Sequence, residues 1–167
     1  MHVSIRTARP EDAQAVQRVL EASYPLLMAS AYESRLLARA LPMITRANPK
    51  LLGSGTYYVA EAGGEAVGCG GWSVHGPGSE PVVAGVAHIR HFGIRPDWTG
   101  RGVGRLIYGR CESAARAAGV RAFECYASLN GEGFYQALGF ARIAEIAVAM
   151  GPHVRFPSVH MRRAIQQ

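Results

Sequence analysis

Hydrophobic positions along the chain alternate between the period of a strand and the period of a helix. His2–Ala8 repeats at every second residue, and the segment after Pro10 repeats at helical spacing until about Tyr24-Pro25. A proline followed by two carboxylates is typical of a helix start. A weaker helical pattern covers Ser34–Leu41 and is expected to end at Pro42. The start of the chain therefore predicts a strand followed by two helices.

The middle of the chain predicts a β-hairpin and then a central strand. Thr56–Glu61 is rich in strand-forming residues, Gly63-Gly64 suits a tight turn, and Ala66–Val74 returns. A Gly/Pro-rich loop is expected over His75–Pro81. The apolar run Val82–Ile94 that follows indicates a strand buried within the sheet.

The rest of the chain alternates helices and strands. A strand–helix–strand crossover joins parallel neighbours and a hairpin joins antiparallel ones, so the complete order indicates a mixed α/β (α+β) sheet. No repeat, low-complexity tract or linker interrupts residues 1–167, and a single domain is expected. The expected elements of this part are helices at Gly102–Ala118 and Gly131–Leu138 and strands at Val120–Ala127, Ala141–Met150 and Ser158–Arg163.

Composition is that of an ordinary globular protein, with 49% hydrophobic and 18% charged residues. The sequence has neither a leader pattern nor an apolar run long enough to span a bilayer, so we expect a cytoplasmic protein without a membrane partner. The net charge of +6 comes from scattered arginines without interleaved aromatic residues, which argues against nucleic-acid binding. The three cysteines fit neither a disulfide framework nor a zinc pattern and are expected to be buried thiols.

The stretch Phe92–Ile107 carries the strongest chemical signal. Three alternating glycines, Gly100, Gly102 and Gly104, stand between an apolar strand and a helical pattern. Glycine lets a ligand approach the backbone closely. The unpaired N–H groups and the positive dipole end at a helix start favour an anion, most often a phosphate. An anion site is therefore predicted where this helix begins.

Several other motifs are excluded by single residues. A dinucleotide-binding fingerprint would need glycine where the chain has Arg105 or Ile107, and a P-loop would need Gly-Lys-Ser/Thr after the glycines. The stretch Gly71–His75 lacks the last glycine of a nucleophile elbow. His88 and His91 lie three residues apart on an expected strand, hence on opposite faces, and make a poor metal pair. No metal cofactor is expected.

Two motifs together resemble the GNAT superfamily of acetyl-CoA-dependent N-acetyltransferases. Thr99–Gly104 reads T-G-R-G-V-G, close to the family's Gln/Arg-x-x-Gly-x-Gly/Ala, with Thr99 in place of Gln or Arg. Downstream, Asn130 is followed by Phe134-Tyr135 and Gly139-Phe140, and the element order matches over essentially the whole chain. The resemblance implies a mixed, mostly antiparallel central sheet of about six or seven strands, with splayed central strands and about four flanking helices.

The resemblance also implies where acetyl-CoA, the expected cosubstrate, would bind. Backbone N–H groups of the glycine loop would hold its pyrophosphate, and the strand edge around Ile94 would pair with the amides of its pantetheine arm. A backbone N–H around Phe92–Ile94 would stabilise the oxyanion of the reaction intermediate. The expected cofactor-binding residues are Phe92, Gly93, Ile94, Thr99, Gly100, Arg101, Gly102, Val103, Gly104, Arg105, Asn130 and Tyr135.

Tyr135 and Asn130 have roles implied by the second motif. Tyr135 matches the family's general-acid tyrosine, which would protonate the leaving thiolate. A half-buried helix tyrosine that fills space is the alternative. Asn130 matches a position that contacts the pantetheine arm, and a cap for the helix that follows is an equal alternative.

The base that accepts the amine proton is expected at His88, which matches the strand position of a catalytic glutamate in some members of the family. His91, Glu124 and a water chain are the competitors. In a regular strand His88 would share a face with Phe92 and Ile94, and a bulge would change this alternation.

The expected function is N-acetylation of a primary amine by direct attack on acetyl-CoA. The alternatives are a protein that binds acyl-CoA without transferring it, as a sensor or accessory module, and a phosphate-binding module for another nucleotide. The acceptor, a small molecule or a peptide or protein amine, has no diagnostic motif. Its wall is expected from Leu26–Pro49, the His75–Pro81 loop and the C-terminal strands. The sequence leaves a homodimer open.

Overall fold

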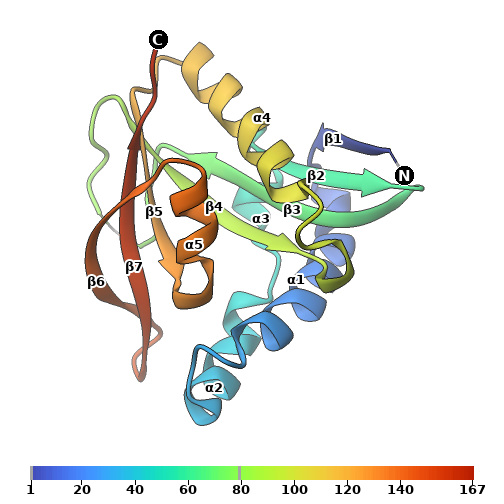
Figure 1. Cartoon of the computed structure of the whole chain (residues 1–167), viewed down its shortest axis with the longest axis vertical. Helices are drawn as coiled ribbons and strands as arrows, with labels where there is room; N and C mark the ends of the chain where they lie inside the picture. Colours follow the sequence, from blue (N-terminus) through green and yellow to red (C-terminus); the bar gives the residue numbers. More distant parts are fainter. Residues whose placement is uncertain (1, 79) are drawn as a thin grey trace.

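A computed structural model describes residues 2–78 and 80–167, and its seven strands form one sheet (Figure 1). The strands follow the order β1-β2-β3-β4-β5-β7-β6. Ser79, part of the loop expected at His75–Pro81, lies outside the described residues. The strands are β1 (Val3–Thr7), β2 (Tyr57–Ala62), β3 (Glu65–Ser73), β4 (Val86–Ile94), β5 (Ala122–Ser128), β6 (Ala141–Met150) and β7 (Val154–Ala164). The helices are α1 (Ala13–Met28), α2 (Ser34–Ile44), α3 (Pro49–Leu52), α4 (Val103–Ala117) and α5 (Glu132–Ala137).

The expected fold class is confirmed, because the sheet is mixed and mostly antiparallel. β4 and β5 run parallel and pair over Val86–His88 against Ala122–Glu124. Beyond His88 the two strands diverge, which is the expected splay (Figure 1). The last part of β4 therefore has β3 on one side and, within the described chain, no neighbouring strand on the other.

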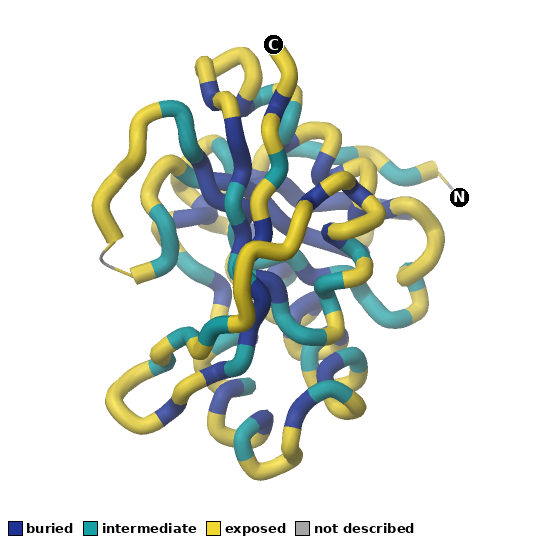
Figure 2. Tube along the Cα trace, turned by 60° about the vertical axis from the view of Figure 1, so that its left-hand side comes forward, coloured by how far each residue is buried: buried dark blue, intermediate teal, exposed yellow. Residues whose placement is uncertain are grey.

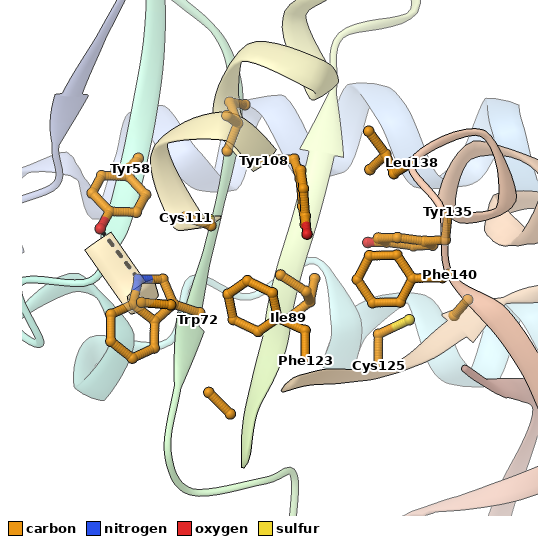
Figure 3. Packing of buried hydrophobic residues seen from close by; sticks show 14 of the residues in the cluster. Tyr58, Trp72, Ile89, Tyr108, Cys111, Phe123, Cys125, Tyr135, Leu138 and Phe140 are labelled. Carbon is orange, nitrogen blue, oxygen red and sulfur yellow. Dashed lines mark hydrogen bonds between the residues drawn. The ribbon is translucent and has the colours of Figure 1, made fainter. Parts of the chain in front are cut away.

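Helices cover both faces of the sheet. α4 and α5 lie over a core that includes Tyr58, Trp72 and Phe123 (Figure 3). α1 and α3 cover the opposite face through a second cluster, to which Leu20 and Leu51 belong. α2 packs against the start of β7 in a third cluster. The splayed edge of β4 is therefore enclosed by helices on both faces.

Burial is concentrated in the central strands, whereas the residues of the edge strand β6 are exposed or half-buried (Figure 2). Cys69, Cys111 and Cys125 are buried free thiols, as expected. Burial raises the pKa of the Cys69 and Cys125 thiols to about 12. Along the described residues, none of the helices combines the length and the apolar composition needed to cross a bilayer.

Two helices continue through prolines that were expected to end them. α1 includes Pro25 and extends to Met28, and α2 includes Pro42 and extends to Ile44. An interior proline costs about 3 kcal/mol, because it removes one hydrogen bond and crowds the preceding turn. The added turns place Met28 and Ile44 in the cluster between α2 and β7, and this packing outweighs the local preference.

Other boundaries also differ from the expectation. β4 begins at Val86 rather than Val82, and Val82 and Val83 are exposed. β7 begins at Val154 rather than at Ser158, since its pairing with β6 extends to the hairpin turn. The short helix α3 was not expected at all.

β4 contains a bulge at His91 and Phe92. His91 has a φ of 56°, and the pairing with β3 steps from Gly93 opposite Cys69 to Arg90 opposite Gly71. The extra residue reverses the alternation of faces. Ile89, Phe92 and Ile94 consequently all contact the core under α4, and His88 lies on the opposite face. Of the two arrangements that the sequence left open, the bulge is the one present, so His88 does not share a face with Phe92 and Ile94.

Gly71 pairs with Arg90 immediately before this bulge, and its substitution tests how closely β2 and β3 pack there. A Cβ on Gly71 would lie 2.6 Å from the Cα of Tyr57 and even closer to the carbonyl oxygen of Thr56. Backbone atoms cannot rotate away, so we expect Gly71→Ala to lower the free energy of unfolding by about 1–3 kcal/mol or more. Urea denaturation measures this change.

Gly109→Ala is the matched control for this prediction. Gly109 lies within α4, and a Cβ there meets no atom within 4 Å. The same substitution should therefore raise the free energy of unfolding by about 0.5–1 kcal/mol through helix propensity. Similar stabilisation by both variants would contradict the close packing beside the bulge.

Candidate functional site

The glycine loop forms the start of α4. Gly100 and Gly102 have φ values of 71° and 84°, and Gly102 is the residue that precedes the first helical residue, Val103. The first intrahelical bond to this end runs from the Leu106 N–H to the Gly102 carbonyl. The N–H groups of the residues between them have no helical acceptor and lie at the positive end of the helix dipole. The loop therefore presents unpaired backbone N–H groups at the position where the sequence predicts an anion site.

A pocket of about 540 Å³, which we call the loop-side pocket, runs from this loop along the free edge of β4. α1 and α5 form its two other walls. It brings together nearly all of the expected cofactor-binding residues. Those that line it are Phe92, Gly93, Ile94, Thr99, Gly100, Gly102, Val103, Gly104, Arg105, Asn130 and Tyr135.

Arg101 is the expected residue that does not line the loop-side pocket. Its guanidinium stacks on the Trp98 ring, 3.8 Å from the ring centroid, and one of its nitrogens lies 3.4 Å from the Asp97 carbonyl oxygen. This cation–π contact holds the side chain against the turn that precedes the loop. Thr99 uses its hydroxyl to bond the Pro96 carbonyl at 2.9 Å. Side chains at both positions thus shape the loop.

Asn130 lies in a single 3-10 turn, Leu129–Gly131, between β5 and α5. The residue that caps α5 is Gly131, and no side chain caps this helix. The helix-cap alternative for Asn130 is therefore wrong. The residue instead lines the loop-side pocket, on the wall formed with Phe134 and Tyr135.

Tyr135 is buried in an aromatic cluster and also reaches a pocket. Its ring centroid lies 5.0 Å from that of Phe134, 5.4 Å from Phe140 and 6.3 Å from Phe92 (Figure 3 shows Phe140 beside it). Burial raises the pKa of the phenol well above its usual value, so the hydroxyl stays protonated. This hydroxyl has no hydrogen-bond partner among the described residues, yet it is not a sealed polar atom. It is therefore available to a molecule in the pocket.

A second pocket of about 200 Å³, the hairpin-side pocket, lies between β4, β5, α2 and the β6–β7 hairpin. The two pockets share Tyr24, Met28, Phe92, Ser128 and Tyr135. A molecule in either pocket would consequently reach the same small region beside the β4 bulge. Such a meeting point suits a reaction between two substrates.

Tyr24 is a residue of this meeting point that the sequence did not identify. Its hydroxyl donates a hydrogen bond of 2.6 Å to the Phe92 carbonyl oxygen, and burial raises its pKa. Along α1 it follows Val16 and Leu20 at four-residue spacing, which indicated only a helix face. The contact with β4 joins residues 68 positions apart, so no local pattern could have predicted it.

The expected base His88 and its competitor Glu124 line neither pocket. His88 is the last β4 residue paired with β5, lies opposite Glu124, and is 9% exposed. Burial lowers its pKa, so the ring is neutral near pH 7. Burial alone would raise the pKa of Glu124, but hydrogen bonds from His160 at 2.6 Å and Arg162 at 2.7 Å outweigh it and lower the pKa.

His91, the other competitor, does line the hairpin-side pocket. Its Nε2 lies 2.7 Å from the Ile44 carbonyl oxygen, which can only accept a hydrogen bond. Nε2 is therefore the protonated nitrogen, and Nδ1 carries the lone pair. Burial lowers the pKa of this ring as well, so the neutral form prevails at neutral pH.

Within the described residues, no group of three His, Cys, Asp or Glu side chains is placed to hold a metal ion. The arrangement combines a glycine loop with unpaired N–H groups, a free strand edge, a protonated phenol and a neutral histidine along two pockets that share one region. These groups can hold a polyanionic donor and move protons during an acyl transfer.

Solved structures of several acetyltransferases share this fold. A GCN5-related N-acetyltransferase from Rhodopseudomonas palustris matches with a TM-score of 0.78 and 24% identity, covering 98% of this chain and 96% of its own. The PaiA N-acetyltransferase from Thermoplasma acidophilum, solved in complex with coenzyme A, matches with a TM-score of 0.74 and 16% identity, covering 98% and 99%. Ard1 from Thermoplasma volcanium matches with a TM-score of 0.68 and 18% identity over 100% of both chains.

No curated protein sequence matches this chain. The family model of the acetyltransferase (GNAT) domain matches residues 53–142, which contain both sequence motifs and the strands that splay. That range covers more than half of the 167 residues. The chain belongs to the GNAT acetyltransferase family.

Proposed function

We propose that the protein transfers the acetyl group of acetyl-CoA to a primary amine by direct attack. The observation that carries the proposal is the meeting of the two pockets at Tyr135 and the β4 bulge, beside an anion-binding loop. The family supports acetyl transfer as the reaction class. The coenzyme A complex of the T. acidophilum enzyme supports coenzyme A as the carrier.

In this proposal acetyl-CoA occupies the loop-side pocket. The N–H groups at the start of α4 bind its pyrophosphate, with Arg105 adding positive charge nearby. The pantetheine amides pair with the free edge of β4 near Ile94, where β5 has diverged. Asn130 faces the arm from the other wall. The thioester then lies beside Phe92 and Tyr135, which line both pockets.

The acceptor amine enters through the hairpin-side pocket and attacks the thioester carbonyl carbon. The carbon–nitrogen bond forms, and the oxygen of the intermediate is stabilised by backbone N–H groups around Phe92–Ile94. The carbon–sulfur bond then breaks, and the leaving thiolate takes the proton of the Tyr135 hydroxyl. Burial disfavours the charged form of a coenzyme thiolate, as it does for the nearby Cys125 thiol with its raised pKa, so protonation stabilises the leaving group.

A histidine on β4 accepts the proton that the attacking nitrogen loses. His88 is the position implied by the family motif, but it would need a water to reach the pocket. His91 lines the pocket and has a free Nδ1 lone pair, so the geometry favours it. Glu124 is engaged by His160 and Arg162, which makes it the weakest candidate.

The alternative function is a sensor that binds acyl-CoA without transferring it. Release of free coenzyme thiol in the presence of an amine panel separates the two, because a sensor would bind acetyl-CoA without any turnover. A cytoplasmic location and a homodimer stay predictions, and analytical ultracentrifugation over a range of protein concentrations tests the homodimer.

Tyr135→Phe tests the general acid. Without the hydroxyl the thiolate must leave unprotonated, so we expect kcat to fall by about 100- to 10,000-fold, with the Kd for acetyl-CoA nearly unchanged. Tyr108→Phe is the control, because its hydroxyl bonds Glu112 and Arg163 outside both pockets. Comparable kcat values for Tyr135→Phe and wild type would rule out the acid role.

Gly102→Val tests the anion loop. A side chain at Gly102 meets no protein atom within 4 Å and would extend into the space proposed for the pyrophosphate. We expect acetyl-CoA affinity to fall by about 100-fold or more, equivalent to roughly 2.7 kcal/mol. Gly119→Val is a matched control, since Gly119 has the same φ of about 83° at the other end of α4 and is also surrounded by open space. Both variants should lose stability, and unchanged coenzyme affinity in Gly102→Val would contradict the loop assignment.

A pair of histidine variants tests the base. In His91→Asn, the new asparagine tolerates the positive φ at this position. In His88→Gln, the new glutamine is similar to histidine in size and polarity. Because burial lowers the pKa of both rings, wild-type kcat at saturating amine should fall only below the usual histidine range of about pH 6.5. We expect the kcat of His91→Asn to be about 100-fold lower than that of the wild type and to show no decrease at acidic pH. His88→Gln should retain both the wild-type kcat and its decrease at acidic pH. The reverse result would assign the base to His88.

A further inference from the structure

The hairpin-side pocket is chemically different from the pocket that faces the glycine loop. Its walls include Ile44, Ile89, Val148, Met150 and Phe156, which are aliphatic or aromatic. The polar groups are neutral: the hydroxyls of Ser128, Ser158 and the tyrosines, and the His91 ring. None of the described residues that line it is an Asp, Glu, Lys or Arg. The pocket therefore offers an apolar surface with a few neutral hydrogen-bonding groups.

Two carboxylates adjoin residues that line this pocket, and both form hydrogen bonds with other side chains. Glu80 accepts a hydrogen bond of 2.6 Å from the Tyr126 hydroxyl, and Glu124 is held by His160 and Arg162. A cation in the pocket would lose hydration without gaining a counter-charge from the residues that line it, which is unfavourable. The same amine in its neutral form would avoid this cost.

The size of the pocket limits the body of the acceptor. Its volume of about 200 Å³ is slightly larger than the roughly 150 Å³ cavity that accommodates one benzene molecule in an apolar protein core. α2 packs against the β6–β7 hairpin beside the pocket, with Ile44, Met150 and Phe156 in one buried cluster. At the hairpin turn, Gly151 lies beside Met43 of α2. A Cβ at Gly151 would lie 3.9 Å from the Met43 sulfur. The contact between α2 and the hairpin therefore forms one wall of the pocket.

We propose that the acceptor is a primary monoamine with a compact apolar body, about one aromatic ring in size, and that it reacts from its neutral form. This inference rests on the proposed acetyl transfer. Polyamines and aminoglycosides are poor acceptors, because their additional ammonium groups would lie in or beside a pocket without carboxylates. The neutral nitrogen has its lone pair free for attack, so the protein needs to remove only the proton released after the carbon–nitrogen bond forms.

An acceptor panel tests this inference. The panel contains 2-phenylethylamine, putrescine, spermidine, kanamycin and an N-terminally blocked lysine peptide, with thiol release as the readout. We expect kcat/KM for 2-phenylethylamine to exceed that of each polycation by about 100-fold or more, consistent with the cost of an unpaired buried charge. A preference for a polycation or for the lysine peptide would overturn the inference while leaving acetyl transfer intact.

Calorimetry separates failure of the inference from failure of the proposed function. Absence of coenzyme A binding would refute the proposed function itself. If coenzyme A binds and no amine is acetylated, titration of 2-phenylethylamine into the coenzyme-loaded protein decides the pocket assignment. Binding would support the apolar amine site in a non-catalytic sensor, and the absence of binding would overturn it.

A charge-introducing variant provides a second, independent test. Val148 lines the pocket, whereas the adjacent Ala149 is exposed and does not. We expect Val148→Asp to lower the preference for 2-phenylethylamine over putrescine by about 10-fold or more, because the new carboxylate can pair with the second ammonium group. Ala149→Asp should leave this preference unchanged. Equal effects of both variants would overturn the assignment of the pocket.

The pH dependence of kcat/KM tests the protonation state in which the acceptor reacts. If the neutral amine reacts, kcat/KM should rise about ten-fold per pH unit until the pH reaches the pKa of the free amine. A 2,2-difluoro analogue of 2-phenylethylamine, which is nearly isosteric and less basic, should shift this limb to lower pH by the difference between the two amine pKa values. Superimposable profiles for the two amines would assign the limb to a protein group and overturn the neutral-amine part of the proposal.

Discussion

The hydrogen bonds that two tyrosines, one buried and one half-buried, donate to the β4 bulge are the interaction on which the site depends. Tyr57 donates to the His91 carbonyl at 2.7 Å and Tyr24 donates to the Phe92 carbonyl at 2.6 Å. A bulge beside a splayed strand interrupts regular pairing, and each buried carbonyl left unpaired would cost about 1–3 kcal/mol. The hydroxyls that remove this cost come from two different elements, β2 and α1, which meet in one hydrophobic cluster. They therefore stabilise an irregular backbone that local sequence preferences would not maintain, since His91 has a positive φ.

The bulge explains how one strand can form a wall of two pockets. Before it, Ile89 lies on the face of the sheet that carries α4, and after it Phe92 and Ile94 lie on that same face. The inserted His91 instead reaches the Ile44 carbonyl of α2, on the opposite face. Without the extra residue, Phe92 would point away from Tyr135, and the ring contact between them at 6.3 Å would be lost. The meeting point of the two pockets is thus a consequence of one additional residue in β4.

The sequence predicts the parts of the site whose geometry is local and not those that depend on distant contacts. The glycine loop and Asn130–Tyr135 were predictable, because their geometry is set within a few consecutive residues: positive φ at Gly102 and a short turn into α5. The face of the sheet on which His88 lies was not predictable, because it depends on the β4 bulge. The hydrogen bonds that support this bulge come from Tyr24 and Tyr57, which are many residues away in the sequence. Likewise, helix propensity correctly identified Pro25 as unfavourable, but burial of Met28 against α2 and β7 decided where α1 ends.

The positive charge of the protein has opposite effects on the ligands proposed for the two pockets. The net charge of +6 and the helix dipole of α4 both attract a polyanion to the loop-side pocket, where free N–H groups lie. For an ammonium ion in the hairpin-side pocket, the same field is repulsive, and burial without a carboxylate adds a desolvation cost. Both effects act in the same direction and disappear when the amine is neutral. Discrimination against cations therefore arises from the whole molecule as well as from the pocket walls, which is why no short motif in the sequence records it.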